Sequence, residues 1–408
     1  MTTTSMESDA FARYRESRPG PRSGALGPNL ILAVLAIAVC AVWWLAAPRL
    51  MVGKTTTFTP RGTDKFPDGV LTIVQLDVGQ GDATFIHTPG GMNVLIDCGE
   101  GANPENDHSR QYPAAKFVVQ PFLEMHGIFE LDMLILTHPD SDHGGGMADL
   151  IDWLYANGGN VKLFVTSGVS KPAVFFDNLL KAVDRHQIKF RSVLEPGSDA
   201  PQPLEYEEYG GTLIGKDLLK DPTIAFQILG PVTRIGDAEG EIANENSVVT
   251  RIQCGKISML SAGDAEVEEE ESLVAFWGPR LRSTINFAAH HGSKTSDQPN
   301  WLRMVNPEYL SSSSHPPVFG HPAADAVKSW KTYIDPPVKY FLRTDMNGDI
   351  WYRTDGNKLS IRTQFPVKSE AEQWEPGHAK EWREYREFKP NDPTTWGDCI
   401  PVPGTDEL

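Results

Sequence analysis

The chain has 408 residues, of which 40% are hydrophobic, so most of it can form a folded core and is not intrinsically disordered. Its 54 acidic and 37 basic residues give a formal charge of −17, which argues against a protein that finds nucleic acid by long-range attraction. The four cysteines are too scattered for a disulfide framework and form no CxxC pair of the kind that binds zinc.

The first 66 residues divide into three segments of different composition. Residues 1–28 are polar, without an apolar period, and predict a disordered tail. Residues 29–52 contain an unbroken apolar run from Leu30 to Ala47, which nearly spans a hydrocarbon core of about 30 Å and predicts one transmembrane anchor. A cleaved signal peptide is the alternative, but the residues before Pro48 form a poor cleavage site. Residues 53–66 predict a linker.

The basic residues that flank this anchor give no preferred orientation in the membrane. Four precede the apolar run and four follow it: Arg13, Arg15, Arg18 and Arg22, then Arg49, Lys54, Arg61 and Lys65. Long domains can translocate regardless of flanking charge. The count permits an extracytoplasmic catalytic domain without showing it, and we expect a single-pass cell-membrane protein with its catalytic domain on that side.

From residue 67 to residue 363 the sequence alternates short β-branched runs with amphipathic stretches. The expected strands are 70–77, 83–87, 93–97, 131–138, 161–167, 224–230, 247–253, 257–263 and 283–289. The expected helices are 114–126, 147–155, 173–186, 266–277 and 323–334. Asn347-Gly348, between two apolar runs in 340–354, predicts a hairpin that closes the fold near residue 363. This alternation favours an α/β layered domain.

The last segment, 364–408, differs from the domain before it. It carries three tryptophans, a net acidic charge and no clear strand, with one helix expected near 379–388. We expect a Trp-rich acidic surface appendage with an unidentified protein partner.

The strongest chemical signal is His138-Pro139-Asp140-Ser141-Asp142-His143, followed by three glycines, directly after the mostly apolar residues 131–137. Four nitrogen and oxygen ligands within six residues can converge only on a small central object, and one or two divalent metal ions fit that description. A surface acidic turn would not need two His and two Asp so close together.

Further metal-competent side chains follow other apolar strands at wide spacing. Asp264 ends the strand 257–263, the pair His290-His291 ends 283–289, and His321 lies in a Gly-His-Pro segment farther on. Delivery of His and Asp at successive strand ends is how a sheet assembles an active site.

These segments resemble the metallo-β-lactamase fold superfamily and, within it, the extracellular hydrolase domain of the DNA-uptake competence protein ComEC. The matching segments occur in the family's order: LDVGQGDA (76–83), LIDCG (95–99), THPDSDHGGG (137–146), NENSVV (244–249), SAGD (261–264), HHGSKTS (290–296), GHP (320–322) and RTDMNGDI (343–350). The resemblance implies a four-layer αββα sandwich over residues 67–363. ComEC's polytopic channel is missing from this sequence, so DNA import is not implied.

The resemblance also implies a two-metal site that takes zinc or manganese. It assigns His138 and Asp140 to one metal, Asp142 and His143 to the other, Asp264 to a bridge between them, and His321 to the second site. Asp140 stands where most of the superfamily has His, which makes the first site harder and more tolerant of manganese. The usual third His is missing as well, because the NENSVV segment offers Asn246 or Ser247.

Other residues are expected to serve catalysis and substrate binding. The catalytic set is Asp142, Asp264 and His291, with a metal-activated hydroxide near the two carboxylates attacking phosphorus. Substrate phosphate is expected to contact His290, His291, Ser293 and Lys294. Asp82 and Asp97 resemble family residues, and Asp97 is expected to orient the ligand loop from behind.

Three functions compete for this sequence. The first is a membrane-anchored metal-dependent nuclease or phosphodiesterase with DNA or RNA as substrate, although the acidic run 264–271 beside the site would repel a polyanion. The second is a hydrolase of a small ester, lactone or amide on the same fold. The third is a degenerate fold that only binds, which the intact His138–His143 segment makes the weakest of the three.

Overall fold

The computed structural model describes residues 65–101, 113–194, 221–236, 243–315, 319–377 and 399–408. The predicted tail (1–28), the anchor (29–52), all but the end of the linker (53–66) and the helix near 379–388 lie outside these residues. Among the described helices, none is both long and apolar enough to cross a membrane.

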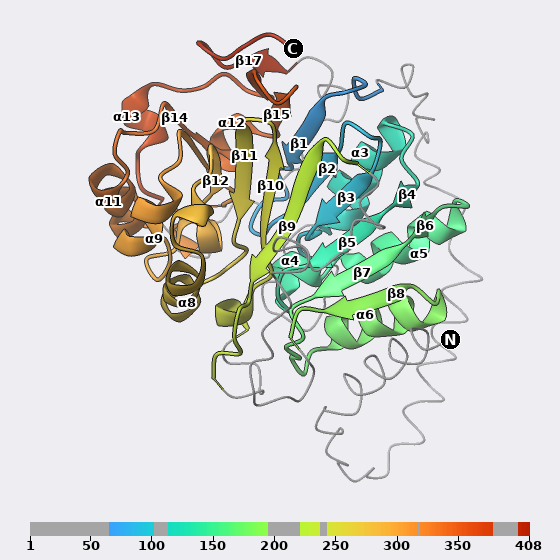
Figure 1. Ribbon diagram of the computed structural model, residues 1–408. Helices are drawn as coiled ribbons and strands as arrows, with labels where there is room; N and C mark the ends of the chain where they lie inside the picture. Colours follow the sequence, from blue (N-terminus) through green and yellow to red (C-terminus); the bar gives the residue numbers. More distant parts are fainter. Residues whose placement is uncertain (1–64, 102–112, 195–220, 237–242, 316–318, 378–398) are drawn as a thin grey trace, which may run out of the picture. The chain divides into compact units, whose positions relative to one another are not determined.

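Two β-sheets form the centre of the described domain (Figure 1). The larger described sheet has nine strands in the order β17-β16-β15-β1-β2-β3-β5-β7-β8. Neighbours are antiparallel from β17 to β3 and parallel from β3 to β8. Its strands are β1 (Leu71–Gln75), β2 (Thr84–His87), β3 (Asn93–Ile96), β5 (Met133–Leu136), β7 (Leu163–Thr166), β8 (Lys189–Ser192), β15 (Ile350–Thr354), β16 (Leu359–Thr363) and β17 (Ile400–Pro401).

The smaller of the two has six described strands in the order β14-β13-β12-β11-β10-β9. Its strands are β9 (Ile224–Gly230), β10 (Val249–Cys254), β11 (Ile257–Ser261), β12 (Ile285–Phe287), β13 (Tyr309–Ser312) and β14 (Tyr340–Arg343). Strands β11 to β14 are parallel, and β9 and β10 are antiparallel to their neighbours. A separate short pair joins β4 (Glu130–Leu131) to β6 (Asn160–Val161).

Side-chain alternation in the strands builds a core on each face of both sheets. In β1, Ile73 enters the core between the two sheets, where it joins Ile252 and Met259 of the smaller sheet. Its neighbour Val74 points the other way, into the core under the first group of helices. The alternation follows from the two-residue period of a strand.

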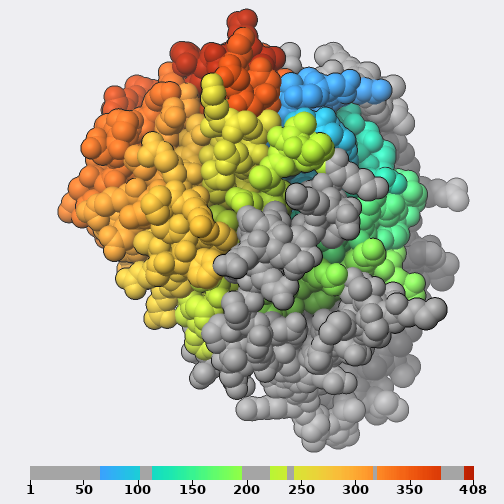
Figure 2. Space-filling model, in the orientation of Figure 1, coloured from blue at the N-terminus to red at the C-terminus, as the bar shows by residue number. Residues whose placement is uncertain are grey.

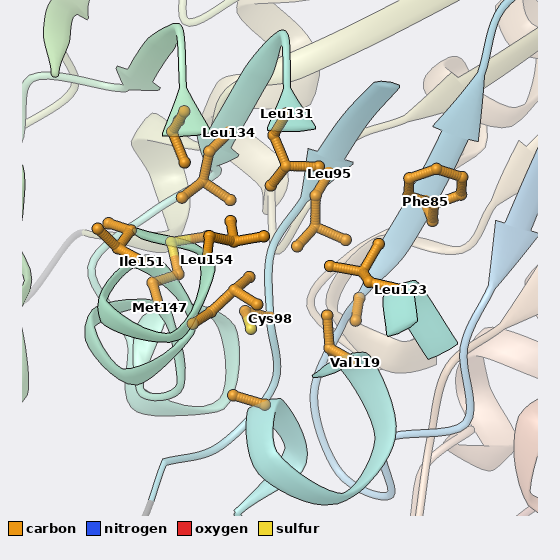
Figure 3. Close-up of a cluster of buried hydrophobic side chains, with 14 of the residues drawn as sticks. Phe85, Leu95, Cys98, Val119, Leu123, Leu131, Leu134, Met147, Ile151 and Leu154 are labelled. Carbon is orange, nitrogen blue, oxygen red and sulfur yellow. The ribbon is translucent and has the colours of Figure 1, made fainter. Parts of the chain in front are cut away.

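Helices cover the outer face of each sheet. On the larger sheet these are η1 (Ala115–Val119), α3 (Gln120–Met125), α5 (Met147–Ala156) and α6 (Val174–Arg185). On the smaller sheet they are α8 (Val267–Trp277), α9 (Pro299–Val305) and α11 (Ala324–Tyr333). Figure 3 shows part of the first helix core, in which Leu95 and Leu134 of the sheet face Leu123 and Ile151 of the helices. The helix-sheet-sheet-helix order confirms the predicted α/β sandwich.

The hairpin predicted at Asn347-Gly348 is wrong. Residues 340–343 form β14 in the smaller sheet, whereas 350–354 form β15 in the larger one. Between them Asn347 ends a single helical turn, α12 (Thr344–Asn347), and Gly348 takes the positive φ of 65° that commonly follows a helix end. The hairpin in this region joins β15 to β16 instead.

The C-terminal segment contributes to the domain more than its composition indicated. Strand β17 pairs with β16 at the edge of the larger sheet, and Val402 beyond it is buried in the core between the sheets. Trp374 packs on Phe341 of β14, with ring centroids 5.0 Å apart. Because these residues add to existing layers, 364–408 is not simply a surface appendage in its described parts. The sequence reading also missed β8 and α9.

Candidate metal centre

The loop after β5 brings two buried imidazoles together. His138 follows the strand, and the one-turn helix α4 (Ser141–Gly144) returns the chain so that His143 lies beside it, with ring centroids 4.2 Å apart. Both side chains are fully buried. Gly81 makes this turn possible, because a Cβ at that position would collide with the backbone carbonyl of Asp142.

Asp97, at the end of β3, holds this loop from behind. Its Oδ2 lies 2.8 Å from Nδ1 of His143 and accepts a hydrogen bond of 2.7 Å from the Thr137 hydroxyl. Its Oδ1 accepts from the Thr137 amide at 2.9 Å. The contact with Nδ1 directs Nε2 of His143 toward the centre of the site.

Asp264, which follows β11, lies at the centre of the cluster. Its Oδ1 is 3.2 Å from Nε2 of His143 and 3.6 Å from Nε2 of His291. Its Oδ2 is 3.8 Å from Nε2 of His138 and 3.6 Å from Nε2 of His290. One buried carboxylate therefore faces four imidazoles delivered by both sheets.

His290 and His291 reach the site through an unusual backbone in η4 (Ala289–Gly292). Their φ angles are 49° and 57°, a left-handed conformation that costs a non-glycine residue about 1–3 kcal/mol. Nδ1 of His291 lies 2.9 Å from the Ser313 carbonyl, and its Nε2 is 3.4 Å from Oδ2 of Asp142. Nδ1 of His290 lies 2.9 Å from Oε1 of Glu266. These contacts hold the two imidazole rings in place despite the strained backbone of His290 and His291.

Four polar atoms at the centre are buried and have no hydrogen-bond partner among the described residues: Nε2 of His138, His143 and His291, and Oδ1 of Asp264. Leaving a buried polar atom unpaired costs about 1–3 kcal/mol. The ligand atoms of His138, His143 and Asp264 all lie within 4.8 Å of one another, as do those of Asp142, His143 and His291. Imidazole nitrogens and carboxylate oxygens are donors for zinc and manganese. The residues present therefore fit one or two divalent ions.

Charge within the cluster shifts several pKa values. Burial lowers the pKa of His143, but the carboxylates of Asp264 and Asp97 outweigh it, so the pKa lies well above its ordinary value. The pKa of His291 is raised in the same way, with Asp264 and Asp82 as the largest carboxylate contributions. Burial and His143 lower the pKa of His138. Metal ligation needs unprotonated imidazole nitrogens, so metal binding at His143 and His291 would be coupled to the release of protons.

The structure places two predicted ligands at the margin. Asp140 is partly exposed, with Oδ2 3.9 Å from Nε2 of His138, and its Oδ1 pairs with Lys171 at 2.6 Å. The His321 ring is stacked 6.3 Å from that of His291, outside the groups whose ligand atoms lie within 4.8 Å. Burial and the two neighbouring histidines, His291 first, lower the pKa of His321 to about 4.

The expected substrate contacts are divided between the inside and the rim. His290 and His291 lie in the cluster, Ser293 is buried with its hydroxyl 2.9 Å from that of Thr295, and Lys294 is exposed. Asp82 lies beside the cluster, with Oδ1 3.6 Å from Nδ1 of His291. The carboxylates and imidazoles named from the sequence thus converge on one edge shared by both sheets.

Sequence reasoning missed Lys171 and Glu266 at this site and left Asn246 and Ser247 as alternatives. The structure turns Asn246 toward the backbone of Ile235 and Ser247 toward His138. The Ser247 hydroxyl lies 3.5 Å from Nδ1 of His138 and accepts a hydrogen bond from the Asp264 amide at 3.2 Å. Lys171 could have been found from its place just after the strand 161–167, which ends at the same sheet edge.

The acidic run 264–271 is less repulsive than its composition indicated. Glu269 and Glu270 are buried and accept hydrogen bonds from backbone amides, including those of Ser247 and Asp297. Their burial raises both pKa values well above the ordinary range, which favours the neutral form.

Comparison with known proteins gives a family and several relatives. A family model described as the metallo-beta-lactamase superfamily matches residues 76–315, a range that contains every residue of the central cluster. The competence protein ComA of Neisseria gonorrhoeae is 26% identical over 331 residues, which are 79% of this chain and 38% of that protein. ComE operon protein 3 of Bacillus subtilis is 27% identical over 301 residues, 72% of this chain and 34% of that protein.

A third relative is Recombination protein 2 of Haemophilus influenzae. It is 29% identical over 239 residues, which are 59% of this chain and 24% of that protein. The chain therefore spans less than two fifths of the length of each of these relatives.

Proposed function

The chain belongs to the metallo-beta-lactamase superfamily, and from that premise we propose that it is a metal-dependent hydrolase that cleaves phosphodiester bonds in nucleic acid. The relatives from competence and recombination support nucleic acid as the substrate class. We also propose that residues 29–52 form a membrane anchor. The extracytoplasmic side for the hydrolase domain is supported only by the resemblance to an extracellular hydrolase domain.

One observation carries the proposal: the buried, unpaired ligand atoms that converge around Asp264. His138, His143, Asp264, Asp142 and His291 would hold one or two ions of zinc or manganese. A bound divalent ion supplies a water of lowered pKa and stabilises developing negative charge.

The protein's own residues supply position and charge. Asp97 and Thr137 fix the imidazole of His143, and the Ser313 carbonyl fixes that of His291. His290, braced by Glu266 and partly exposed, would contact a phosphate oxygen at the mouth of the site. Lys294 on the exposed rim would add a positive charge there.

The test is hydrolysis by the full-length chain in a neutral detergent. Substrates are single-stranded DNA, duplex DNA, RNA and bis-p-nitrophenyl phosphate, each with manganese, zinc or a chelator. We expect metal-dependent cleavage that Asp142→Asn lowers at least about a hundredfold, because that carboxylate faces His291 at the centre. Asp149→Asn, the same substitution at an exposed position of α5, should retain the wild-type rate.

Thermal unfolding gives a second readout that does not depend on activity. Binding to the folded state alone stabilises by RT ln(1 + [L]/Kd), or about 2.7 kcal/mol at a hundredfold excess over Kd. We expect manganese or zinc to raise the Tm of the wild type and of Asp149→Asn, and to raise that of Asp142→Asn less. Cleavage that survives chelation, or equal rates in the two variants, would contradict the proposal.

A small neutral ester, lactone or amide is the second candidate substrate. The carboxylates around the mouth favour it, because Asp82, Asp140 and Glu266 are all partly exposed there and would repel a polyanion. Metal binding without cleavage of any phosphodiester, together with hydrolysis of an ester or lactone, would select this candidate.

A further inference from the structure

A second concave site lies on the outer face of the smaller sheet, away from the metal centre. A cavity of about 930 Å³ is formed by β9, β10, the start of β11, the two residues before β12, and the turn η3 (Gly278–Leu281) that follows α8. Ligand pockets in proteins commonly measure about 300–1,000 Å³. Figure 2 shows lime and yellow atoms, the colours of β9 to β11, at the surface of the face in view.

Strand alternation explains why this cavity is polar. In β10, Ile252 and Cys254 point into the core between the sheets, so Arg251 and Gln253 point outward. The helices that cover this sheet pack over the apolar residues nearer the metal centre, such as Val249 and Leu260. The opposite end of the same face is thereby lined by polar side chains.

Four cationic side chains line the cavity: Arg251, Lys256, Arg280 and Arg282. None of the ion pairs between described residues involves any of the four. The single acidic side chain in the lining, Glu308, is paired with Lys339 at 2.7 Å. In a chain with a net charge of −17, the cavity is a local concentration of unneutralised positive charge.

The cations of the cavity differ in how they are held. Arg251 is half-buried, donating to the Arg282 carbonyl at 3.0 Å and to Oε1 of Gln253 at 2.8 Å. Arg280 and Arg282 are exposed at the rim. The Arg251 guanidinium is therefore fixed, and Lys256 donates a hydrogen bond to Oδ1 of Asn357 at 2.9 Å, whereas the exposed Arg280 and Arg282 can follow a flexible anion.

An exposed aromatic ring completes the rim. Phe276 is 50% exposed and packs edge-on against Trp277, with centroids 5.0 Å apart. Trp277 is anchored in turn by a 2.8 Å hydrogen bond from its Nε1 to the Leu229 carbonyl. A ring held in this way offers a face on which an unstacked base can pack.

We propose that this cavity binds single-stranded nucleic acid, with its cations on the phosphates and Phe276 under a base. This inference rests on the proposed function, because it supplies the attraction for a polyanion that the acidic mouth of the metal centre lacks. Arg251 is four residues along the chain from Ser247 beside His138, which at the rise of a strand is roughly 13 Å. The cavity and the metal centre therefore lie toward opposite ends of the same strand, β10. A duplex is a poorer fit, since its bases are already stacked.

The test compares two variants that lose the same charge. The first removes three cavity cations, Lys256→Gln, Arg280→Gln and Arg282→Gln; the control removes Lys181, Lys189 and Lys328, exposed lysines elsewhere, also to Gln. Binding of a fluorescent oligothymidylate to the full-length chain is followed by anisotropy in the presence of chelator, at several salt concentrations. We expect the cavity variant to bind at least about tenfold more weakly, with a salt slope smaller by about 2, because each phosphate contact on a single strand contributes about 0.7. The control should bind like the wild type.

A third variant tests the aromatic ring. Phe276→Ala should weaken oligothymidylate binding about tenfold while leaving the salt slope unchanged, because stacking releases no counterions. Equal losses in the two charge variants would overturn the proposal, since only the net charge would then matter. Poly-glutamate competing as well as the oligonucleotide would overturn it in favour of an acidic protein partner.

Hydrolysis of bis-p-nitrophenyl phosphate separates this inference from the proposed function. The small diester does not need the cavity, so the cavity variant should hydrolyse it at the wild-type rate. Wild-type protein that cleaves the diester but does not bind the oligonucleotide contradicts the cavity proposal alone. Binding that depends on the cavity, without cleavage of any phosphodiester, contradicts the proposed function alone.

Discussion

At the scale of single residues, the metal centre depends on side chains that hold other side chains. Asp97 is buried and so cannot contact a substrate directly. It contacts His143 and accepts hydrogen bonds from both the amide and the hydroxyl of Thr137. Its own backbone has a φ of 58°, a conformation that Asn tolerates better than most residues. The strand end therefore fixes a carboxylate where it can orient a ligand imidazole.

We expect Asp97→Asn to weaken divalent metal binding about 10–100-fold, the usual cost of losing such a partner. The substitution keeps the backbone conformation and one carbonyl acceptor, but it replaces the oxygen facing Nδ1 of His143. The measurement is competition for zinc or manganese with a chromogenic chelator. Asp152→Asn, at an exposed ion pair with Arg185, is the control, and equal affinity in the two variants would rule out the supporting role of Asp97.

At the scale of elements, the passage from β14 to β15 carries the chain from one sheet to the other. Asp349 lies at the start of β15, fully buried, and its Oδ1 accepts the Asp77 amide at 2.7 Å just beyond β1. Burial raises the pKa of Asp349 to about 7. Between about pH 4 and pH 7 the folded protein therefore holds a proton that the unfolded chain has lost, so this residue makes stability fall as the pH rises.

Asp349→Asn should remove that pH dependence, because the amide is neutral throughout and can still accept from Asp77. We expect the variant to gain about 2–4 kcal/mol over the wild type at pH 8 and almost nothing at pH 4. Urea unfolding at the two pH values measures the difference. Exposed Asp68→Asn should follow the wild type, and an Asp349→Asn variant with the wild-type slope would show that Asp349 ionises normally.

The C-terminal strand gives a second prediction at this scale. Val402 is 1% exposed, and its amide donates to the Ile361 carbonyl at 2.8 Å, whereas Ile400 two residues before it is 39% exposed. Val402→Ala should lower the free energy of unfolding by about 1–2 kcal/mol through lost apolar burial. Ile400→Ala should lower it by less than about 0.5 kcal/mol. If denaturant unfolding gave equal losses for Val402→Ala and Ile400→Ala, the C-terminal strand would not be packed in solution as it is in the structure.

At the scale of the whole molecule, opposite charges occupy different places. The mouth of the metal centre is rich in carboxylates, while the basic cavity occupies the far end of one sheet face. In our proposal the basic cavity attracts the polyanion, whereas the metal centre carries out the hydrolysis. The apolar run in 29–52 precedes all of the described domain, whose packing begins at Phe66 against Phe85.

We expect the full-length chain to sediment with membranes and to be released by detergent but not by high salt. A chain of residues 53–408 should stay in the soluble fraction with an unchanged Tm, because both sheets and their helices lie after residue 64. The measurement is fractionation followed by thermal unfolding of each form. Aggregation of the shorter chain would show that the apolar run packs against the domain instead of anchoring it.

The sequence by itself determined most strands and helices, the layered α/β class and the set of metal-competent residues. Buried faces of strands and helices leave a hydrophobic period in the sequence, so most elements can be predicted from it. Strands that end at one edge of a sheet bring the residues that follow them close together. His138, Asp264 and His291 could therefore be predicted as site residues. The missing third His was also visible, although the part played by Ser247 was not.

Only the tertiary structure decided which sheet each strand joins and which distant residues meet. An apolar run records that a strand is buried but not its partner, which is why β14 and β15 were read as a hairpin and β17 was missed. The pair of Lys171 with Asp140 and the basic cavity join residues far apart in the chain. Such contacts depend on how whole layers pack, and no local pattern in the sequence encodes that packing.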